Sequence, residues 1–181
     1  IGGHLSDLLL RSGHDITVYD NLMFETRYFK DINFIYGDIR EREKLLKILK
    51  DFNVVVWLAA IVGDGACAVD PALTKTINED SVKWLVDNYE GKIVFTSTCS
   101  IYGIHDHLID EDAEFNPQSV YASTKLAAEK YIIENCDNYL IFRLGTLFGL
   151  GDDFSRVRLD LVVNILTVRA MKSEPLTVFG G

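Results

Sequence analysis

The sequence predicts an α/β fold built on a doubly wound parallel sheet with helices on both faces. Short runs of β-branched and aromatic residues alternate with segments of helical periodicity. A regular β-α-β alternation implies a parallel sheet that is covered on both sides. The 181 residues suffice for one domain, or for one domain and part of a second. The composition, 48% apolar and 25% charged, is that of an ordinary globular protein.

Strands and helices are expected to follow one another along the chain. The expected strands are Ile16–Tyr19, Ile32–Tyr36, Val54–Ala60, Ile93–Thr96 and Tyr139–Phe142. The expected helices are Leu5–Arg11, Glu41–Lys50, Ala72–Asn88 and Val120–Asn135. Beyond Arg143 the pattern changes to a glycine-bearing loop, which we expect to be followed by a helix near Leu159–Arg169 and a strand at Leu176–Phe179. We therefore expect two parts, residues 1–144 and the start of a smaller lobe at residues 145–181.

Both ends of the chain look interrupted. The sequence opens at the start of a helix, although the first strand of a doubly wound sheet lies at its centre, and it closes as a strand finishes. We expect a piece of a longer protein that lacks the first strand and most of the C-terminal lobe.

Charge and composition exclude several function classes. The net charge is −9 with no basic stripe, which argues against a nucleic-acid binder. The longest apolar run, Val54–Val62, is far shorter than the ~20 residues that span a bilayer, and no signal peptide is expected. The widely spaced Cys67, Cys99 and Cys136 predict no disulfide framework, so a reducing cytoplasm is the simplest compartment. No cluster of cysteines and histidines predicts a metal site.

Three short segments have the pattern of a dinucleotide site. In dinucleotide-binding folds, an acid that binds the ribose follows the last glycine of the phosphate-binding loop by roughly twenty residues. Asp20 follows Gly2 at about this spacing. A plain helix start and a turn-capping aspartate explain this stretch equally well. Asp38 follows the next strand and can accept from an adenine amino group, or form a capping box with Glu41, or do both. The small residues of Leu58-Ala59-Ala60 suit a cofactor crossing the sheet edge, and they equally suit a buried strand end.

The strongest chemical signal lies in the middle of the chain. Tyr121 and Lys125 are four residues apart on an expected helix, so they share one face. A lysine ammonium beside a phenol favours the phenolate and makes the tyrosine a usable base. Thr98 ends a Ser/Thr-rich strand about twenty residues earlier, where its hydroxyl can hold a substrate oxygen. Tyr-x-x-x-Lys alone occurs by chance in many helices, but the combination with this strand end is much less common.

These elements, in this order, resemble the extended short-chain dehydrogenase/reductase superfamily, and within it the NAD-dependent sugar-nucleotide epimerase/dehydratase family. The resemblance covers essentially the whole chain and implies a Rossmann-like, three-layer fold. It rests on Gly2, Asp20, Gly37-Asp38-Ile39, Leu58-Ala59-Ala60, Asn78, Ser97-Thr98, Tyr102-Gly103, Tyr121, Lys125 and Arg143-Leu144-Gly145.

The resemblance implies a role for each matched residue. Tyr121 exchanges the proton of the sugar hydroxyl, Thr98 binds the same oxygen, and Lys125 binds the nicotinamide ribose and lowers the pKa of Tyr121. The implied cofactor is NAD rather than NADP, because Asp20 would repel a 2′-phosphate. The implied cofactor-binding residues are Gly2, Asp20, Asn21, Asp38, Ile39, Leu58, Ala59, Ala60, Asn78, Tyr121 and Lys125. The implied substrate-side residues are Thr98, Cys99, Thr146, Arg156 and Arg158. Residues 1–144 would then be the NAD-binding domain, residues 145–181 the start of the substrate lobe, and the protein a homodimer.

Departures from the family pattern bear on the reaction. Thr146 stands where the family usually has an asparagine that contacts the substrate's phosphates; Arg156 and Arg158 are candidate replacements, or two solvated surface arginines. Cys99 and Ser100 occupy positions where the dehydratases carry acids, so dehydration is disfavoured. Cys99 is also one residue away from the position of a catalytic cysteine, so we expect it to pack.

Three functions remain at this point. The favoured one is an NAD-dependent epimerase that transiently oxidises a hydroxyl of a nucleotide sugar. The alternatives are a reductase of keto-sugar nucleotides and a non-catalytic dinucleotide sensor that retains the fold. The complete set of Thr98, Tyr121 and Lys125 favours an enzyme.

Overall fold

The computed structural model describes residues 1–24, 28, 30–151, 159 and 161–177. The chain divides into two compact units. The first unit comprises Ile1–Val18, Leu22–Phe34 and Thr146–Gly181, and the second unit comprises Tyr19–Asn21 and Ile35–Gly145.

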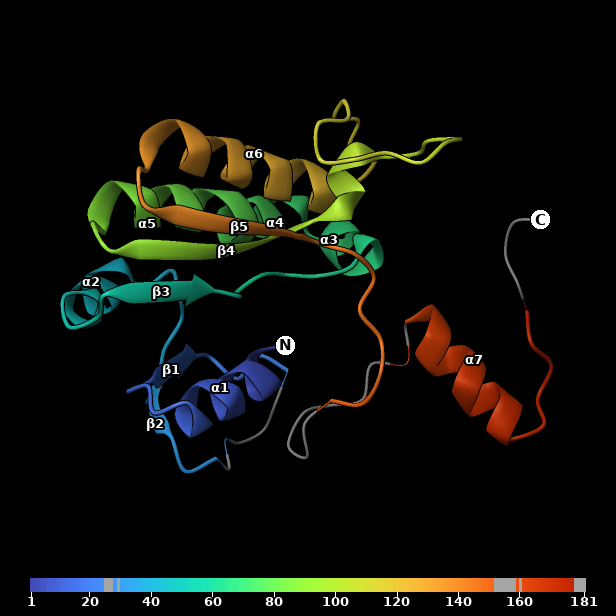
Figure 1. The fold of residues 1–181 in the computed structure, drawn as a ribbon, viewed down its shortest axis with the longest axis horizontal. Coiled ribbons are helices and arrows are strands. Elements are labelled where there is room, and N and C mark those ends of the chain that lie inside the picture. Colours follow the sequence, from blue (N-terminus) through green and yellow to red (C-terminus); the bar gives the residue numbers. More distant parts are fainter. Residues whose placement is uncertain (25–27, 29, 152–158, 160, 178–181) are drawn as a thin grey trace. The chain divides into compact units, whose positions relative to one another are not determined.

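A parallel sheet forms the centre of the second unit. Its strands follow the order β3-β4-β5 (Figure 1), with bounds Val54–Trp57, Lys92–Thr98 and Tyr139–Leu144. In the parallel register Val56 lies beside Val94, and Phe95 lies beside Ile141. Parallel strands require crossover connections, which the intervening helices supply. The carboxyl ends of all three strands therefore lie at one edge of the sheet.

The helices of the second unit are mostly where the apolar periodicity predicts them. Their bounds are Arg42–Leu49 for α2, Asp64–Val69 for α3, Pro71–Lys75 for α4, Ser81–Asn88 for α5 and Val120–Asn135 for α6. A π-helical segment, η1 (Thr76–Asp80), joins α4 to α5, so the helix expected at Ala72–Asn88 contains one wide turn. A short 3₁₀ helix, η2 (Cys99–Tyr102), follows β4 directly.

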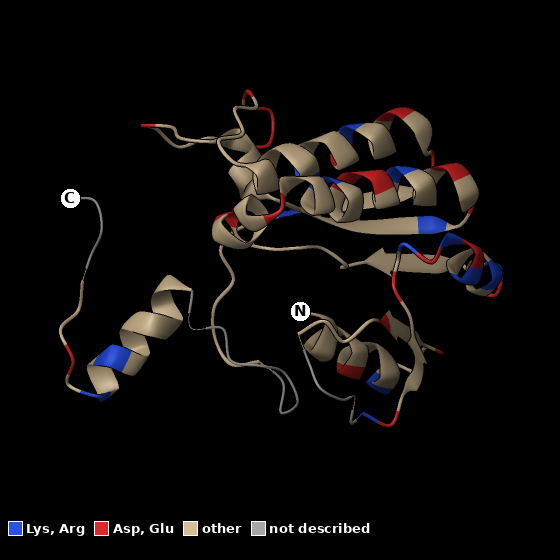
Figure 2. Cartoon of the chain, turned by 180° about the vertical axis from the view of Figure 1, so that it is seen from behind, with Lys and Arg blue, Asp and Glu red and all other residues tan. Residues whose placement is uncertain are grey.

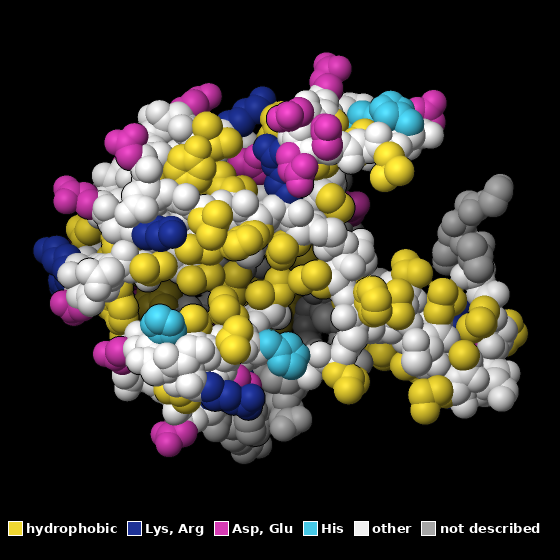
Figure 3. All heavy atoms as spheres, in the orientation of Figure 1, with side chains coloured by type: hydrophobic (Ala, Val, Ile, Leu, Met, Phe, Trp, Pro, Cys, Tyr) yellow, Lys and Arg dark blue, Asp and Glu magenta, His cyan; other side chains and the backbone are white. Residues whose placement is uncertain are grey.

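The core of the second unit lies between the sheet and the helices α5 and α6. Leu85 of α5, Ile93 and Phe95 of β4, and Ile132 of α6 are fully buried in one apolar cluster. Burying each such side chain contributes roughly 1.5–3 kcal/mol. Leu140 and Phe142 of β5 are exposed instead, and hydrophobic side chains gather over β4 and β5 on the face drawn in Figure 3. The helices of this unit thus leave part of the sheet uncovered.

The first unit contains the N-terminal helix and the last helix, with bounds Gly2–Arg11 for α1 and Val162–Met171 for α7. Lys30 ties α1 to the chain that follows, because its ammonium binds the Gly3 carbonyl oxygen at 2.7 Å and the Asp7 carboxylate at 2.8 Å. Strand β1 (Thr17–Asp20) pairs with β2 (Asn33–Tyr36), and the last residues of both strands belong to the second unit.

The structure corrects several expected boundaries. The strand expected at Val54–Ala60 stops at Trp57, and the irregular segment that follows leads to α3, a helix that the sequence analysis missed. Leu176 and Thr177 are not in a strand, and the rest of that expected strand lies outside the described residues. None of the helices in the described ranges has the length and hydropathy needed to cross a membrane.

Gly103 is required where η2 ends. Its φ of +74° favours glycine, and a Cβ there would lie 2.1 Å from the backbone oxygen of Asn116. Gly103→Ala should therefore lower the free energy of unfolding by about 1–3 kcal/mol, measured by chemical denaturation. The control is Gly65→Ala in α3, where a Cβ meets no atom within 4 Å. Equal effects of the two substitutions would contradict this account of the loop.

Candidate active site

The start of α6 places the candidate base. The Ser119 hydroxyl accepts a hydrogen bond from the Ala122 N–H at 3.2 Å and caps the helix. Tyr121 therefore lies in the first turn, and Lys125 and Glu129 follow it at intervals of four residues on the same face. The helix spans Val120–Asn135, as the sequence predicts.

The end of β4 brings Thr98 to Tyr121. Thr98 caps η2, since its Oγ1 accepts from the Ser100 N–H at 3.2 Å and its hydroxyl donates to Ser100 Oγ at 3.1 Å. Thr98 also forms a hydrogen bond with Tyr121 that favours the phenolate. Two of the three predicted catalytic residues are thus in direct contact.

Burial opposes the ionisation of Tyr121. The pKa of Tyr121 is raised above its usual value, mainly by desolvation, and the hydrogen bond with Thr98 reduces that rise. Nearby Cys67 and Asp64 of α3 and Cys99 of η2 also raise this pKa. Desolvation therefore dominates the pKa of Tyr121 in the chain by itself, and the lowering expected from Lys125 stays a prediction.

Lys125 has an unusual environment for a cation. It is buried, and its Nζ lies 4.0 Å from the centroid of the Phe95 ring, in cation–π geometry. Desolvation lowers the pKa of Lys125 to about 7, and the negative charge of Glu129 opposes that shift. Burial therefore favours the neutral amine of Lys125, and the charge of Glu129 favours the ammonium.

Asn78 fixes the turn that follows β3. Its amide nitrogen donates to the Ile61 carbonyl oxygen at 2.9 Å, and its amide oxygen accepts from the Ile61 N–H at 2.8 Å. Asn78 is buried in the π-helical segment, a geometry often found at functional sites. Both ends of its amide bind the backbone of Ile61, so Asn78 holds the residue that directly follows Leu58-Ala59-Ala60.

Asp38 lies beside the end of β1. Its carboxylate accepts from Asn21 Nδ2 at 2.8 Å, from the Arg40 N–H at 2.9 Å and twice from the Arg40 guanidinium at 2.8 Å. These hydrogen bonds hold the pKa of Asp38 well below its usual range, and the bonds from Arg40 have the largest effect. A carboxylate has about four acceptor sites, so an adenine amino group would have to displace one of these donors.

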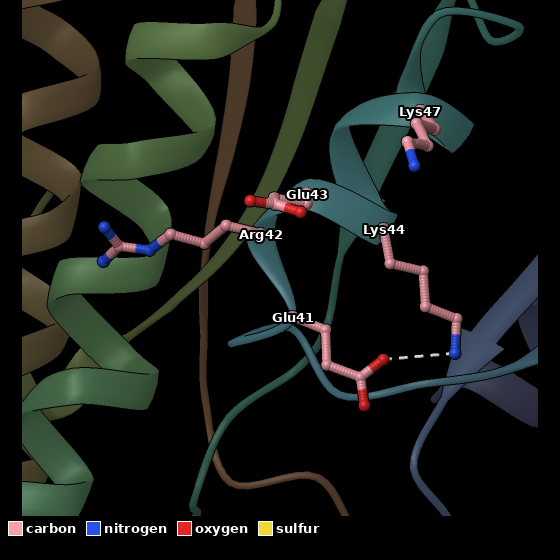
Figure 4. Close-up of a pocket in the computed structure, with 5 residues that line it drawn as sticks. All are labelled: Glu41, Arg42, Glu43, Lys44 and Lys47. Atoms are coloured by element: carbon pink, nitrogen blue, oxygen red, sulfur yellow. Dashed lines mark ion pairs between the residues drawn. The ribbon is translucent and has the colours of Figure 1, made fainter.

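The capping box expected between Asp38 and Glu41 is wrong. Helix α2 begins at Arg42 with Glu41 as its N-cap, and the Glu41 side chain forms no cap hydrogen bond. Glu41 instead pairs with Lys44 at 3.1 Å (Figure 4). The pocket drawn in Figure 4 has a volume of about 440 Å³ and is lined only by charged residues of this segment, none of which is a predicted site residue.

The remaining predicted residues lie in different parts of the chain. Gly2 starts α1 and Thr146 is exposed, both in the first unit. Asp20 is exposed at the end of β1, where its backbone oxygen accepts from the Gly37 N–H at 3.0 Å, and Ile39 packs against the core. Cys99 is exposed, although it was expected to pack. Arg156 and Arg158 lie outside the described residues.

The sequence analysis missed a buried ion pair behind Lys125. Glu129 Oε1 accepts from Arg143 Nε at 2.9 Å and from Arg143 Nη2 at 2.7 Å. Arg143 also donates to the Tyr102 hydroxyl at 2.5 Å and to the Glu111 carbonyl oxygen at 2.7 Å. It thereby anchors the acidic loop between η2 and α6 (Figure 2). The continuation of the Tyr121–Lys125 spacing to Glu129 was the available signal.

The fold and the site together define a class. A parallel sheet carries a threonine at the end of one strand, and the next helix presents a tyrosine and a buried lysine one turn apart. Within the described residues no group of histidines, cysteines and acids could hold a metal ion. The arrangement is that of a dinucleotide-binding α/β protein with the tyrosine–lysine pair of the short-chain dehydrogenases.

Comparison with known proteins identifies the family. The model of the "NAD dependent epimerase/dehydratase family" matches residues 1–181, and the chain belongs to this family. A putative UDP-glucose 4-epimerase of Methanocaldococcus jannaschii is 29% identical, over 99% of this chain and 63% of that protein. The UDP-glucose 4-epimerase of Bacillus subtilis is 27% identical, over 99% of this chain and 61% of that protein.

A solved structure has the same fold. It is the UDP-glucuronic acid 4-epimerase of Bacillus cereus, solved with UDP-glucuronic acid and NAD. The two sequences are 28% identical and the structures match with a TM-score of 0.83. The match covers 99% of this chain and 62% of the B. cereus chain. The chain thus spans less than two thirds of the length of these relatives.

Removing the Asn78 amide should loosen the turn after β3. Asn78→Ala leaves the backbone N–H and carbonyl of Ile61 without partners, so we expect the free energy of unfolding to fall by about 1–3 kcal/mol. The control is Asn88→Ala in α5, which removes an exposed hydrogen bond to Trp84 and should change stability by no more than about 0.5 kcal/mol. Chemical denaturation measures both; a loss at Asn78 no larger than at Asn88 would refute the assigned role.

Proposed function

We propose that the complete protein is an NAD-dependent epimerase of nucleotide sugars, and that the described chain contains its cofactor site and catalytic residues. The hydrogen bond between Thr98 and Tyr121 and the four-residue spacing of Tyr121 and Lys125 on α6 support this proposal most directly, together with the family match over residues 1–181. Residues 1–144 are proposed as the NAD-binding domain and residues 145–181 as the start of the substrate lobe.

Each catalytic side chain has one task in the proposed reaction. The Tyr121 oxygen takes the proton of the sugar hydroxyl and later returns it, while the Thr98 hydroxyl orients that same sugar oxygen. Asp20 and Lys125 would hold NAD, which would supply a reversible hydride acceptor for the sugar carbon. Lys125 in its ammonium form binds the nicotinamide ribose and stabilises the phenolate. The cofactor is unchanged after a full cycle.

The residues present suit NAD. The exposed Asp20 carboxylate stands at the end of β1, where it can accept from the adenosine ribose hydroxyls and would repel a 2′-phosphate. The turn of small residues after β3 is held by Asn78, so its backbone has a fixed shape for the cofactor to cross. Lys125, four residues after Tyr121 on α6, supplies a buried amine that can carry a positive charge.

Uridine diphosphate sugars are the first substrates to test. The relatives from B. subtilis and B. cereus are named for UDP-glucose and UDP-glucuronic acid. Dehydration is disfavoured because the residue that follows Cys99 in η2 is Ser100 and not an acid. The Ser100 hydroxyl oxygen accepts a hydrogen bond from Thr98. A keto-sugar reductase would consume reduced cofactor in proportion to product, and a dinucleotide sensor would bind NAD without turnover.

Tyr121→Phe removes only the ionisable oxygen. General acid–base catalysis contributes roughly 10²–10⁴-fold, so kcat for epimerisation of the preferred UDP-sugar should fall by about that factor, with NAD still bound. Tyr131→Phe is the matched control, because it removes a hydroxyl from the same helix, one that donates to Asp87 at 2.8 Å. Turnover of Tyr121→Phe within a few-fold of Tyr131→Phe would mean that Tyr121 is not the base.

The complete protein is also proposed to be a cytoplasmic homodimer that pairs through α5 and α6. Ile133 is an exposed apolar residue of α6 and is a suitable probe of that surface. A glutamate in an apolar helix interface would be desolvated without a partner, so Ile133→Glu should shift the mass measured by light scattering from dimer to monomer. A wild-type protein that is monomeric at every concentration would remove the dimer proposal.

A further inference from the structure

One buried carboxylate is not used in the proposed chemistry. Glu129 is 1% exposed and lies one helical turn beyond Lys125 on α6. Its Oε1 accepts both hydrogen bonds from Arg143, whereas Oε2 is buried and has no hydrogen-bond partner in the described part of the chain. An unpaired carboxylate oxygen inside a protein is costly, so its position calls for a compensating interaction.

The compensating charge lies on the next turn. Residues four apart on a helix have Cβ atoms about 5–6 Å apart, so Lys125 and Glu129 extend from the same face of α6, and both side chains are buried. Lys125 is 3% exposed, and the face of Phe95 covers its ammonium at 4.0 Å to the ring centroid. Glu129 is the charge that favours the ammonium form of Lys125.

The other charges around α6 have partners of their own. Glu79 of η1 pairs with Lys83 of α5 at 2.7 Å and with Lys75 of α4 at 3.5 Å. Asp87 of α5 accepts from the Tyr131 hydroxyl at 2.8 Å.

The groups that face the active-site end of α6 act on Tyr121 rather than on Lys125. They are Asp64 and Cys67 of α3 and Cys99 of η2. From β5, Arg143 reaches this region through its bonds to Glu129.

We propose that Glu129 is a positioning residue of the active site: its carboxylate keeps Lys125 in the ammonium form, and Arg143 limits that effect by neutralising part of the carboxylate's charge. The proposal rests on the function proposed above, in which an ammonium at Lys125 supports the Tyr121 phenolate. It assigns to the Glu129–Arg143 pair a catalytic purpose in addition to anchoring the loop after η2.

The proposal predicts shifts of opposite sign for the two partners. Glu129→Gln keeps an oxygen that can accept from Arg143 but removes the negative charge, so the titration midpoint of Lys125 should fall by about one pH unit or more. Arg143→Gln removes the neutralising cation, so the same midpoint should rise. A general loosening of the fold would hydrate Lys125 and move the midpoint upward in both variants.

The titration of Lys125 is measurable by NMR in the complete protein labelled with ¹³C at the lysine Cε. Loss of one signal in Lys125→Arg assigns the resonance. Glu134→Gln is the control, because Glu134 is an exposed acid on the same helix, and its removal should leave the midpoint unchanged. Opposite shifts in Glu129→Gln and Arg143→Gln support the proposal. An unchanged midpoint in Glu129→Gln, or shifts of the same sign in both variants, overturns it.

A kinetic measurement separates this proposal from the proposed function. At neutral pH, kcat for the UDP-sugar should fall about tenfold or more in Glu129→Gln and stay within a few-fold of wild type in Glu134→Gln. If Tyr121→Phe abolishes turnover while Glu129→Gln leaves kcat and the Lys125 midpoint unchanged, the enzyme assignment stands and the role of Glu129 is refuted. If the wild type has no turnover, the NMR titration still decides whether Glu129 controls the charge of Lys125.

Discussion

The burial of one lysine charge constrains the rest of the candidate site. An ammonium removed from water is unstable unless other charges or a ring face compensate it. In this chain the face of Phe95 and the carboxylate of Glu129 provide that compensation. Glu129 is in turn held by Arg143, and Arg143 binds Tyr102 and the backbone of Glu111. The hydrogen bonds that begin at Glu129 thus reach the loop between η2 and α6.

Backbone geometry supplies the other constraint. Three parallel strands end at one edge, so Thr98 and the turn after β3 lie at the same side of the sheet. The hydrogen bonds of Ser119 fix where α6 begins, and those of Asn78 fix the turn. Catalytic groups must be held closely for proton transfer to be efficient. The side chains that hold backbone segments are therefore as important to the site as those proposed to touch the substrate.

Much of the fold and of the site followed from the sequence because local patterns encode them. The apolar periodicity predicted α6 at its observed bounds, and the Tyr121–Lys125 spacing predicted a shared face. Long-range contacts were not readable in the same way. The partnership of Glu129 with Arg143 joins a helix to a strand, and the cluster around Asp38 depends on how Asn21 and Arg40 converge. The π-helical turn at Asn78 also escaped prediction, because its sequence has ordinary helical periodicity. The upward shift of the Tyr121 pKa was missed because it depends on burial, which spacing does not reveal.

The central claim is that Tyr121, Thr98 and Lys125 support a reversible oxidation of the sugar in which a hydride leaves and returns on the protein. Epimerisation of a UDP-sugar by the complete protein in D₂O tests it most directly, with the product analysed by NMR at the inverted carbon. We expect inversion with no deuterium at that carbon, because the hydrogen travels as a hydride and never exchanges with solvent. Deuterium at the inverted carbon would show that this hydrogen is removed as a proton, and would rule out the hydride mechanism.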